Sequence, residues 1–221
     1  MKRINVSSEF LKWIALLAMT VDHVDFICAK MGWLHNTLGR IAFPIFSFLL
    51  LSNFITYHPV KKYLIRMGSF ALVSQALFYL FHFESTNVLF SFFYALLFIS
   101  SVEELSKIKS FCIQLYFVFF LLINLFPFVL IADYSLFGFF FLLALYAYLR
   151  KKTVLNCTAV FLTGFFINSY NILSALITLM ILVFLLFGIQ VVKGRRLIKW
   201  WFFYLYYPLH KLGLHLLSNF F

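Results

Sequence analysis

The amino-acid sequence predicts an all-α protein: a polytopic transmembrane helical bundle of about nine spans that forms one domain over residues 1–221. Of the 221 residues, 64% are hydrophobic and only 11% are charged, which leaves too little polar surface to cover a soluble globule. Apolar runs long enough for a hydrocarbon core of ~30 Å recur along the whole chain. Lysine and arginine, in addition, gather in alternate loops between these runs.

Six apolar runs are long enough to cross a bilayer, and three shorter runs lie between them. The long runs are at about residues 8–29, 38–56, 63–83, 111–131, 172–192 and 200–221. The shorter runs are at about residues 87–102, 134–149 and 153–168. These three fall below the usual ~20 residues, but they are uninterrupted and flanked by charge, so we expect short or buried helices there. The total is nine spans, with eight or ten as alternatives.

The 18 lysines and arginines predict the orientation of the chain. If the N-terminus is cytoplasmic, it and the loops on its side hold 14 of them, whereas the opposite loops hold only Lys30 and Arg40, and Lys12 and Lys211 lie within spans. Short cytoplasmic loops are enriched in these residues. The formal net charge of +11 is therefore a signal of topology, and it requires no nucleic-acid partner. The C-terminus is expected on the outer side.

Asp22 and His23 stand side by side near the end of the first span. A charged side chain at the centre of a membrane helix costs ~2.5 to 3.5 kcal/mol, so such residues indicate function. At 100° per residue, Lys12 lies on the same stripe as His23, while Asp22 points away. We therefore expect a residue from another helix, Arg40 or Asp133, to orient His23, and we expect Asp22 to pair with Arg40. An ion pair that only fixes packing is the alternative.

The last span contains a second polar stretch, LYYPLHKLGLH. Pro208 removes one backbone N–H from the helix, and His210 follows two residues later. Tyr207 lies three residues before His210 and shares its face. This arrangement suits either a polar pocket or a hydrogen-bonded kink, and both remain open.

Further basic residues near the ends of two spans have simple membrane interpretations. Lys61, Lys62 and Arg66 follow a predicted cytoplasmic loop and could meet phosphates or anionic headgroups, or serve only as positive-inside anchors. Near the outer end of the last span, Lys211 and His215 are expected to extend toward the headgroups.

Other chemistries leave no motif in the sequence. The three cysteines are scattered and lack metal-ligand spacing, and there is no Gly-rich phosphate loop and no G-x-S-x-G. We therefore expect no metal, and a mechanism here must combine single residues from separate helices.

Five blocks of sequence, in this order, resemble the TraX family of bacterial membrane proteins: LKWIALLAMTVDHV, GRIAFPIFSFLL, KKYLIRMGSFALVSQ, ADYSLFG and FYLYYPLH. The founding member of the family acetylates the N-terminal residue of conjugative pilin, and the family is similar to membrane acyltransferases that acetylate envelope glycans. The resemblance implies an enzyme of the bacterial inner membrane that moves an acetyl group from cytoplasmic acetyl-CoA to an amine or hydroxyl acceptor. Its partners would be membrane lipid and an acceptor such as pilin or an envelope glycan.

The resemblance implies the position of the catalytic histidine, and the roles of the other residues are inferred from their chemistry. His23 falls on the position of the histidine suspected of catalysis, and as a neutral imidazole it would act as general base. Asp133 could hold the tautomer of His23, and Asp22 lies next to His23 in the chain. Arg40 or Tyr207 would stabilise the oxyanion that forms during acyl transfer. The coenzyme phosphates would be held by Lys61, Lys62 and Arg66. Substrate would be contacted by Lys12, Tyr134, Tyr207 and His210.

Two other classes of function compete with acyl transfer. In a proton-coupled transporter or flippase, Asp22, His23 and His210 would form a proton relay. If the protein is instead a noncatalytic assembly factor for pili or envelope machinery, the His23→Ala protein would still support that assembly.

Overall fold

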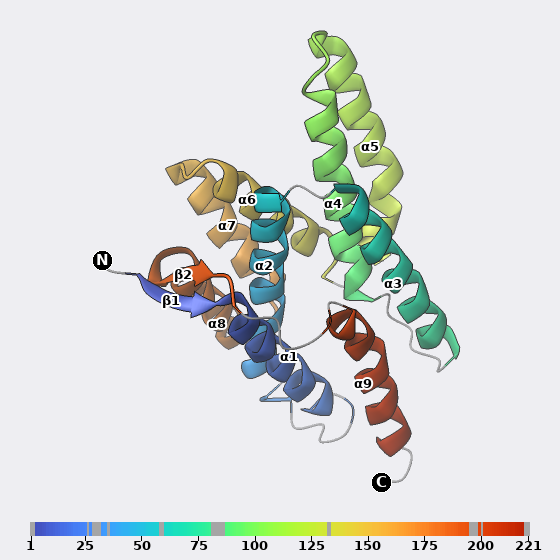
Figure 1. The fold of residues 1–221 in the computed structure, drawn as a ribbon, viewed down its shortest axis with the longest axis vertical. Coiled ribbons are helices and arrows are strands. Elements are labelled where there is room, and N and C mark those ends of the chain that lie inside the picture. Colours follow the sequence, from blue (N-terminus) through green and yellow to red (C-terminus); the bar gives the residue numbers. More distant parts are fainter. Residues whose placement is uncertain are drawn as a thin grey trace.

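The structure is a computed structural model, and it describes residues 3–25, 27, 32–34, 36–57, 60–80, 87–131, 134–194, 199 and 201–218. The described residues form nine α-helices and a single pair of four-residue strands. The predicted all-α class is confirmed (Figure 1).

The helices follow the predicted apolar runs in order. They are α1 (Ser8–Val24), α2 (Ala42–Tyr57), α3 (Val60–Leu80), α4 (Val88–Leu105), α5 (Phe111–Ile131), α6 (Ser135–Arg150), α7 (Val154–Ile167), α8 (Ile172–Val183) and α9 (Phe202–Ser218). A 3-10 turn, η2 (Leu38–Ile41), leads into α2. Polar side chains start several of the helices, because they accept the first backbone N–H groups. Asn87 does so for α4, Thr153 for α7 and Asn171 for α8.

The predicted span at about 172–192 is helical only as far as Gly188. Helix α8 ends at Val183, a single π turn, η3 (Phe184–Gly188), follows, and the chain then forms strand β2 (Ile189–Val192). This strand pairs in parallel with β1 (Ile4–Ser7). Three of the four β2 residues are β-branched and favour extended backbone. The N-terminal segment supplies the hydrogen-bonding partner that the local pattern did not reveal.

Four helices in the described part of the chain are long and apolar enough to cross a membrane: Leu38–Tyr57, Val60–Leu80, Val88–Leu105 and Phe111–Ile131. The third of these corresponds to a run that the sequence indicated as short. Helices α1 and α9 have 17 residues each in the structure. The number of complete spans therefore stays a prediction.

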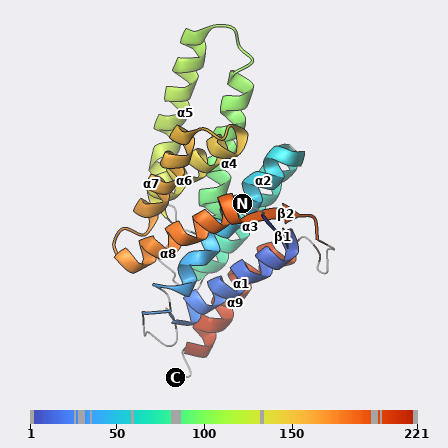
Figure 2. The same cartoon turned by 90° about the vertical axis from the view of Figure 1, so that its left-hand side faces the viewer.

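The helices form a central body from which one hairpin projects. Helix α2 is the most buried of the long helices and packs against α1, α6 and α8. Helices α4 and α5 extend beyond the body at one end, and α1 and α9 lie side by side at the other (Figures 1 and 2). Helix α5 buries only Leu125 and Val129. The body and its α1–α9 end hold the polar residues described next.

Candidate functional site

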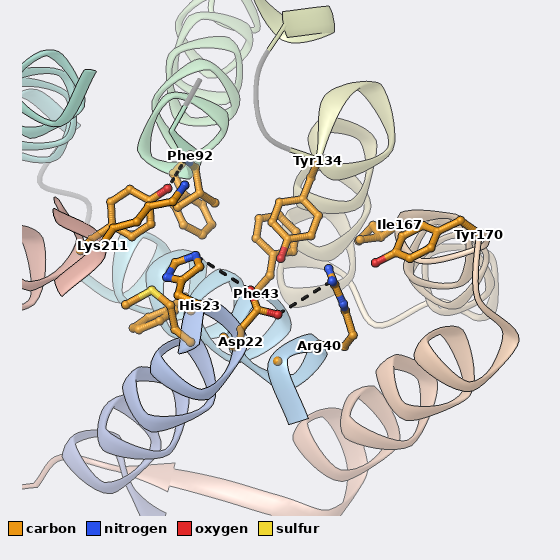
Figure 3. Close-up of a pocket in the computed structure, with 15 residues that line it drawn as sticks. Asp22, His23, Arg40, Phe43, Phe92, Tyr134, Ile167, Tyr170 and Lys211 are labelled. Atoms are coloured by element: carbon orange, nitrogen blue, oxygen red, sulfur yellow. Dashed lines mark hydrogen bonds and ion pairs between the residues drawn. The ribbon is translucent and has the colours of Figure 1, made fainter. Parts of the chain in front are cut away.

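A cavity of about 370 Å³ opens where α1, η2, α2, α4 and α9 meet. Figure 3 shows the polar side chains that face it. Its lining comprises Met19, Asp22, His23, Gly39, Arg40, Ala42, Phe43, Phe46, Val88, Phe92, Tyr134, Ile167, Tyr170, Tyr207 and Lys211. The cavity thus combines an apolar floor with an acid, an imidazole, two cations and three phenols.

His23 contacts a second histidine from the last helix. Its Nδ1 lies 2.6 Å from Nε2 of His210, and the two rings stack with centroids 4.8 Å apart. The expectation that another helix orients His23 is met in geometry, but the contact comes from His210 in α9. Asp133, one of the two residues expected there, lies outside the described residues.

Asp22 lies between His23 and Arg40. One carboxylate oxygen, Oδ2, is 3.9 Å from Nε2 of His23, and the other, Oδ1, is 3.8 Å from Nη2 of Arg40. The expected pairing of Asp22 with Arg40 is therefore present. Arg40 is 7% exposed, so this pair is largely shielded from solvent, which strengthens the attraction between the charges.

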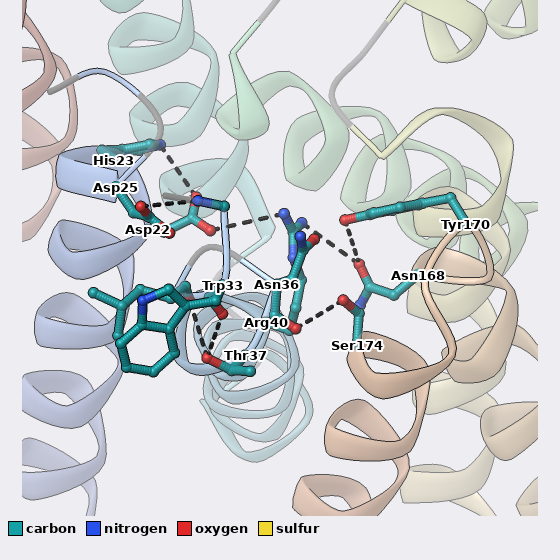
Figure 4. A network of polar contacts seen from close by, with 12 residues as sticks. Asp22, His23, Asp25, Trp33, Asn36, Thr37, Arg40, Asn168, Tyr170 and Ser174 are labelled. Carbon is teal, nitrogen blue, oxygen red and sulfur yellow. Dashed lines mark hydrogen bonds and ion pairs between the residues drawn. The ribbon is translucent and has the colours of Figure 1, made fainter. Parts of the chain in front are cut away.

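A polar network on the far side of Arg40 holds its guanidinium in place (Figure 4). Nη1 of Arg40 donates to Oδ1 of Asn168 at 3.5 Å, and the Tyr170 hydroxyl donates to the same oxygen at 3.4 Å. The amide nitrogen of Asn168 donates to Thr178 Oγ1 at 2.8 Å, which in turn donates to the Ser174 carbonyl. Because the Thr178 proton is already committed, Asn168 must present its oxygen to Arg40. Sequence reasoning missed this network.

Comparison with known proteins identifies the family. The family model described as TraX protein matches residues 7–218, nearly the whole chain. The chain belongs to the TraX family. No curated protein and no solved structure matches it. With four helices of membrane-spanning length and composition, this TraX family member is a bacterial membrane protein.

The side chain of Lys211 in the TraX protein does not point where the sequence indicated. It was expected to extend toward the headgroups, but it is only 9% exposed and lines the cavity, with its ammonium 4.4 Å above the Phe78 ring. The aromatic face and the surrounding helices hold the side chain inward, since a cation gains from a desolvated ring. Figure 3 shows Asp22 and His23 between Lys211 and Arg40. A charge within an apolar run was the signal that could have revealed this residue.

The two tyrosines predicted to contact substrate both line the cavity. Tyr207 accepts the backbone N–H of Val88 at 3.3 Å, at the first turn of α4. Tyr134 caps α6 in the left-handed backbone region, with φ of 63°, and its ring stacks on Phe43 at 4.1 Å. Gly138 allows this turn, because a Cβ there would lie 2.5 Å from the Tyr134 Cβ.

The remaining predicted site residues do not line the cavity. Lys12 forms an ion pair with Glu9 at 2.6 Å, a partner that sequence reasoning missed. Lys61 and Lys62 are exposed and Arg66 is half-buried near the start of α3. Lys61 lies 17 residues before Phe78 in this helix, or roughly 25 Å along its axis.

Proposed function

We propose that this TraX protein is an integral-membrane acyltransferase that moves an acetyl group from acetyl-CoA to an amine or hydroxyl acceptor, with His23 as the general base. The acceptor would be the N-terminal amine of a pilin or a hydroxyl of an envelope glycan. One observation carries the proposal: a half-buried imidazole and acid, His23 and Asp22, and the buried guanidinium of Arg40 converge on one cavity. General acid–base catalysis of acyl transfer can use such a base together with a fixed positive charge for the oxyanion.

The proposed reaction proceeds by addition and elimination at the thioester carbonyl. His23 takes the proton from the acceptor N–H or O–H while that nitrogen or oxygen forms a bond to the acetyl carbon. The C–S bond then breaks, and the departing thiolate receives the proton from His23. The products are the acetylated acceptor and free coenzyme A, and His23 returns to its neutral form.

Asp22 supports the charge that forms on His23 in this step. An imidazolium 3.9 Å from the Asp22 carboxylate gains about 4 kcal/mol of Coulomb attraction at an effective dielectric constant of 20. Arg40 carries a permanent charge toward the same cavity and can stabilise the tetrahedral oxyanion. Tyr207 can share this role, because a phenol that accepts the Val88 N–H still has its own O–H to donate.

The size of the cavity decides which part of the donor it can hold. Its volume of about 370 Å³ is near the lower end of the ~300 to 1,000 Å³ of ligand pockets. It suits the acetyl group with the end of the pantetheine arm and the reacting part of the acceptor. The nucleotide would lie outside it, with its phosphates near Lys61, Lys62 and Arg66 on the proposed cytoplasmic side of the inner membrane. The charge asymmetry of the loops supports that orientation.

Transfer of radiolabel from acetyl-CoA tests the proposal. Membranes containing the wild-type protein should transfer label to one of the lipid, glycan or protein fractions, which identifies the class of acceptor. The His23→Ala protein should transfer label at least ~100-fold more slowly, because a positioned base contributes 10² to 10⁴-fold. His215→Ala makes the same change in α9 at a position that does not line the cavity, and it should keep the wild-type rate.

Two results would contradict the proposal. If no fraction acquires label with any variant, the protein does not transfer acetyl groups. The next hypothesis to test is then a proton-coupled transporter or flippase, which moves its substrate without changing it covalently. If His23→Ala equals wild type at matched expression, His23 serves packing, as in an assembly factor.

A further inference from the structure

Three contacts fix the ring of His210. Its Nδ1 lies 2.7 Å from the backbone carbonyl oxygen of Tyr206, one helical turn earlier. Its Nε2 lies 2.6 Å from Nδ1 of His23. The Tyr206 ring also stacks on the imidazole, with centroids 4.8 Å apart and planes 12° apart. The imidazole of His210 is therefore held between a backbone acceptor and the imidazole of His23.

The positions of the protons follow from these contacts. A carbonyl oxygen can only accept a hydrogen bond, so the proton of neutral His210 is on Nδ1. Its Nε2 then carries the lone pair and accepts from His23. The proton of neutral His23 is therefore on Nδ1, and the lone pair of His23 is on Nε2, the nitrogen 3.9 Å from the Asp22 carboxylate. Within the neutral pair, the Tyr206 carbonyl decides the tautomer of both rings.

We infer that His210 is a positioning residue that locks His23 in the Nδ1–H tautomer, with the basic Nε2 presented to the cavity beside Asp22. The chain of hydrogen bonds runs from His23 through His210 to the Tyr206 carbonyl, and it links α1 to α9. Its catalytic meaning rests on the proposed function, since a general base must have its lone pair, not its proton, toward the acceptor. The assignment of the tautomer rests only on the contacts of the two rings.

Asp22 shows why such a lock is needed. A carboxylate is a stronger acceptor than a neutral imidazole, and an oxygen of Asp22 lies on the Nε2 side of the ring. Without His210, His23 would gain by turning its proton toward Asp22, which would remove the lone pair from the cavity. The short contact of 2.6 Å to His210, against 3.9 Å to Asp22, favours the Nδ1–H form.

A second contact holds the two helices in the required register. Thr20 Oγ1 donates to the Leu16 carbonyl at 2.8 Å, so it accepts from the Tyr206 hydroxyl, also at 2.8 Å. Thr20 lies three residues before His23, and Tyr206 lies four residues before His210. The two pairs of partners follow one another in the same direction, so α1 and α9 run parallel here and both contacts form together.

Nitrogen NMR of the histidine rings measures the tautomer directly. The full-length protein, with ¹⁵N-labelled histidine, is placed in lipid bilayers above pH ~8, where free histidine is neutral because its pKa is ~6.5. The His23 signals are assigned by their absence from His23→Ala. We expect protonated Nδ1 and unprotonated Nε2 for His23 in the wild type. A wild-type His23 with its proton on Nε2 would overturn the inference without any variant.

Two substitutions at His210 separate the lock from simple packing. In His210→Gln the side-chain amide oxygen can still accept from His23, so the Nδ1–H tautomer should persist. In His210→Leu that acceptor is gone, and the Nε2–H form should increase as the proton turns toward Asp22. An unchanged His23 tautomer in His210→Leu would show that His210 does not control it. His215→Gln serves as the matched control in the same helix, and it should leave the His23 signals unchanged.

Label transfer by the same variants links the tautomer to catalysis. His210→Gln should retain more than a tenth of the wild-type rate, whereas His210→Leu should lose at least ~100-fold, the smaller value for a lost general base. Equal rates in the two variants would contradict a positioning role. If wild-type His23 has the expected tautomer but neither the wild type nor any variant transfers label, the proposed function is wrong. The inference that His210 fixes the tautomer of His23 is then still supported. If the wild type transfers label while its His23 carries the proton on Nε2, the inference about His210 is wrong and the proposed function is still supported.

Discussion

At the scale of single residues, the close approach of η2 to α1 depends on Gly39. A Cβ built on Gly39 would lie 1.9 Å from Oδ1 of Asp22 and 2.8 Å from its Cβ. Neither atom is the end of a long flexible side chain, so the contact cannot be relieved by a small rotamer change. The absence of a side chain at residue 39 thus lets the next residue, Arg40, reach the Asp22 carboxylate.

Gly39→Ala should therefore destabilise the protein. Overpacking of this kind costs about 1 to 3 kcal/mol, and the substitution should lower the thermal unfolding midpoint of the protein in detergent. Gly213→Ala is the matched control, because a Cβ there meets no atom within 4 Å. Alanine in an open helix position is favoured over glycine by about 0.5 to 1 kcal/mol, so the midpoint of this control should stay the same or rise. Equal midpoints for Gly39→Ala and wild type would show that Asp22 can move aside.

At the scale of secondary-structure elements, α1 and α9 are joined by polar contacts in an apolar surrounding. Thr20 meets the Tyr206 hydroxyl, and His23 meets His210, one turn further along both helices. In lipid there is little hydrophobic gain from bringing two helices together, so hydrogen bonds and close packing decide their partners. The polar residues at this end therefore select α9 as the neighbour of α1.

A double-mutant cycle with Thr20→Val and Tyr206→Phe should detect this selection. Both substitutions keep the shape of the side chain and remove one partner of the hydrogen bond. The expected coupling in the free energy of unfolding is about 0.6 kcal/mol, the average for such bonds between membrane helices. Tyr116→Phe removes the same hydroxyl from α5, where the side chain is exposed, and it should show no coupling to Thr20→Val. A coupling near zero in both cycles would mean that the hydrogen bond adds nothing to the pairing.

At the scale of the whole molecule, the apolar exterior and the charged loops predict one orientation in the membrane. Helix α5 exposes a phenylalanine-rich surface, including Phe111, Phe119 and Phe120, which suits contact with lipid tails. Lys107 and Lys109 lie between α4 and α5, at the end of the projecting hairpin (Figure 1). The distribution of charge predicts that this end faces the cytoplasm and that the loop containing Trp33 faces the opposite side.

Single cysteines placed in a cysteine-free background should report this orientation. Cys28, Cys112 and Cys157 are first replaced. A cysteine at Lys109 should react with a membrane-impermeant maleimide only after spheroplasts are opened, whereas a cysteine at Trp33, which is 60% exposed, should react in intact spheroplasts. The reverse pattern would place the N-terminus outside and would require the coenzyme to enter at another site.

The composition and the apolar runs of the sequence were enough to predict the membrane class, the order of the helices and most of their boundaries. In lipid each helix must satisfy its backbone hydrogen bonds within its own segment. Local hydropathy is therefore enough to predict each helix. The predicted run at 111–131 matches α5, and its neighbours differ by a few residues. The change from helix to strand after Gly188 was missed, because β2 forms only when a strand from the other end of the chain, β1, lies beside it.

The polar residues Asp22, His23, Arg40 and His210 could also be recognised in the sequence, since charge and imidazole are rare in lipid. Apart from the pairing of Asp22 with Arg40, their partners could not be recognised there. Helical periodicity relates residues a few positions apart, whereas His23 and His210 are 187 positions apart. Tertiary packing alone decided that His210 meets His23, that Asn168 supports Arg40 and that Lys211 turns inward. Each of these contacts depends on the position of one helix against another, which side-chain packing sets and local sequence does not encode.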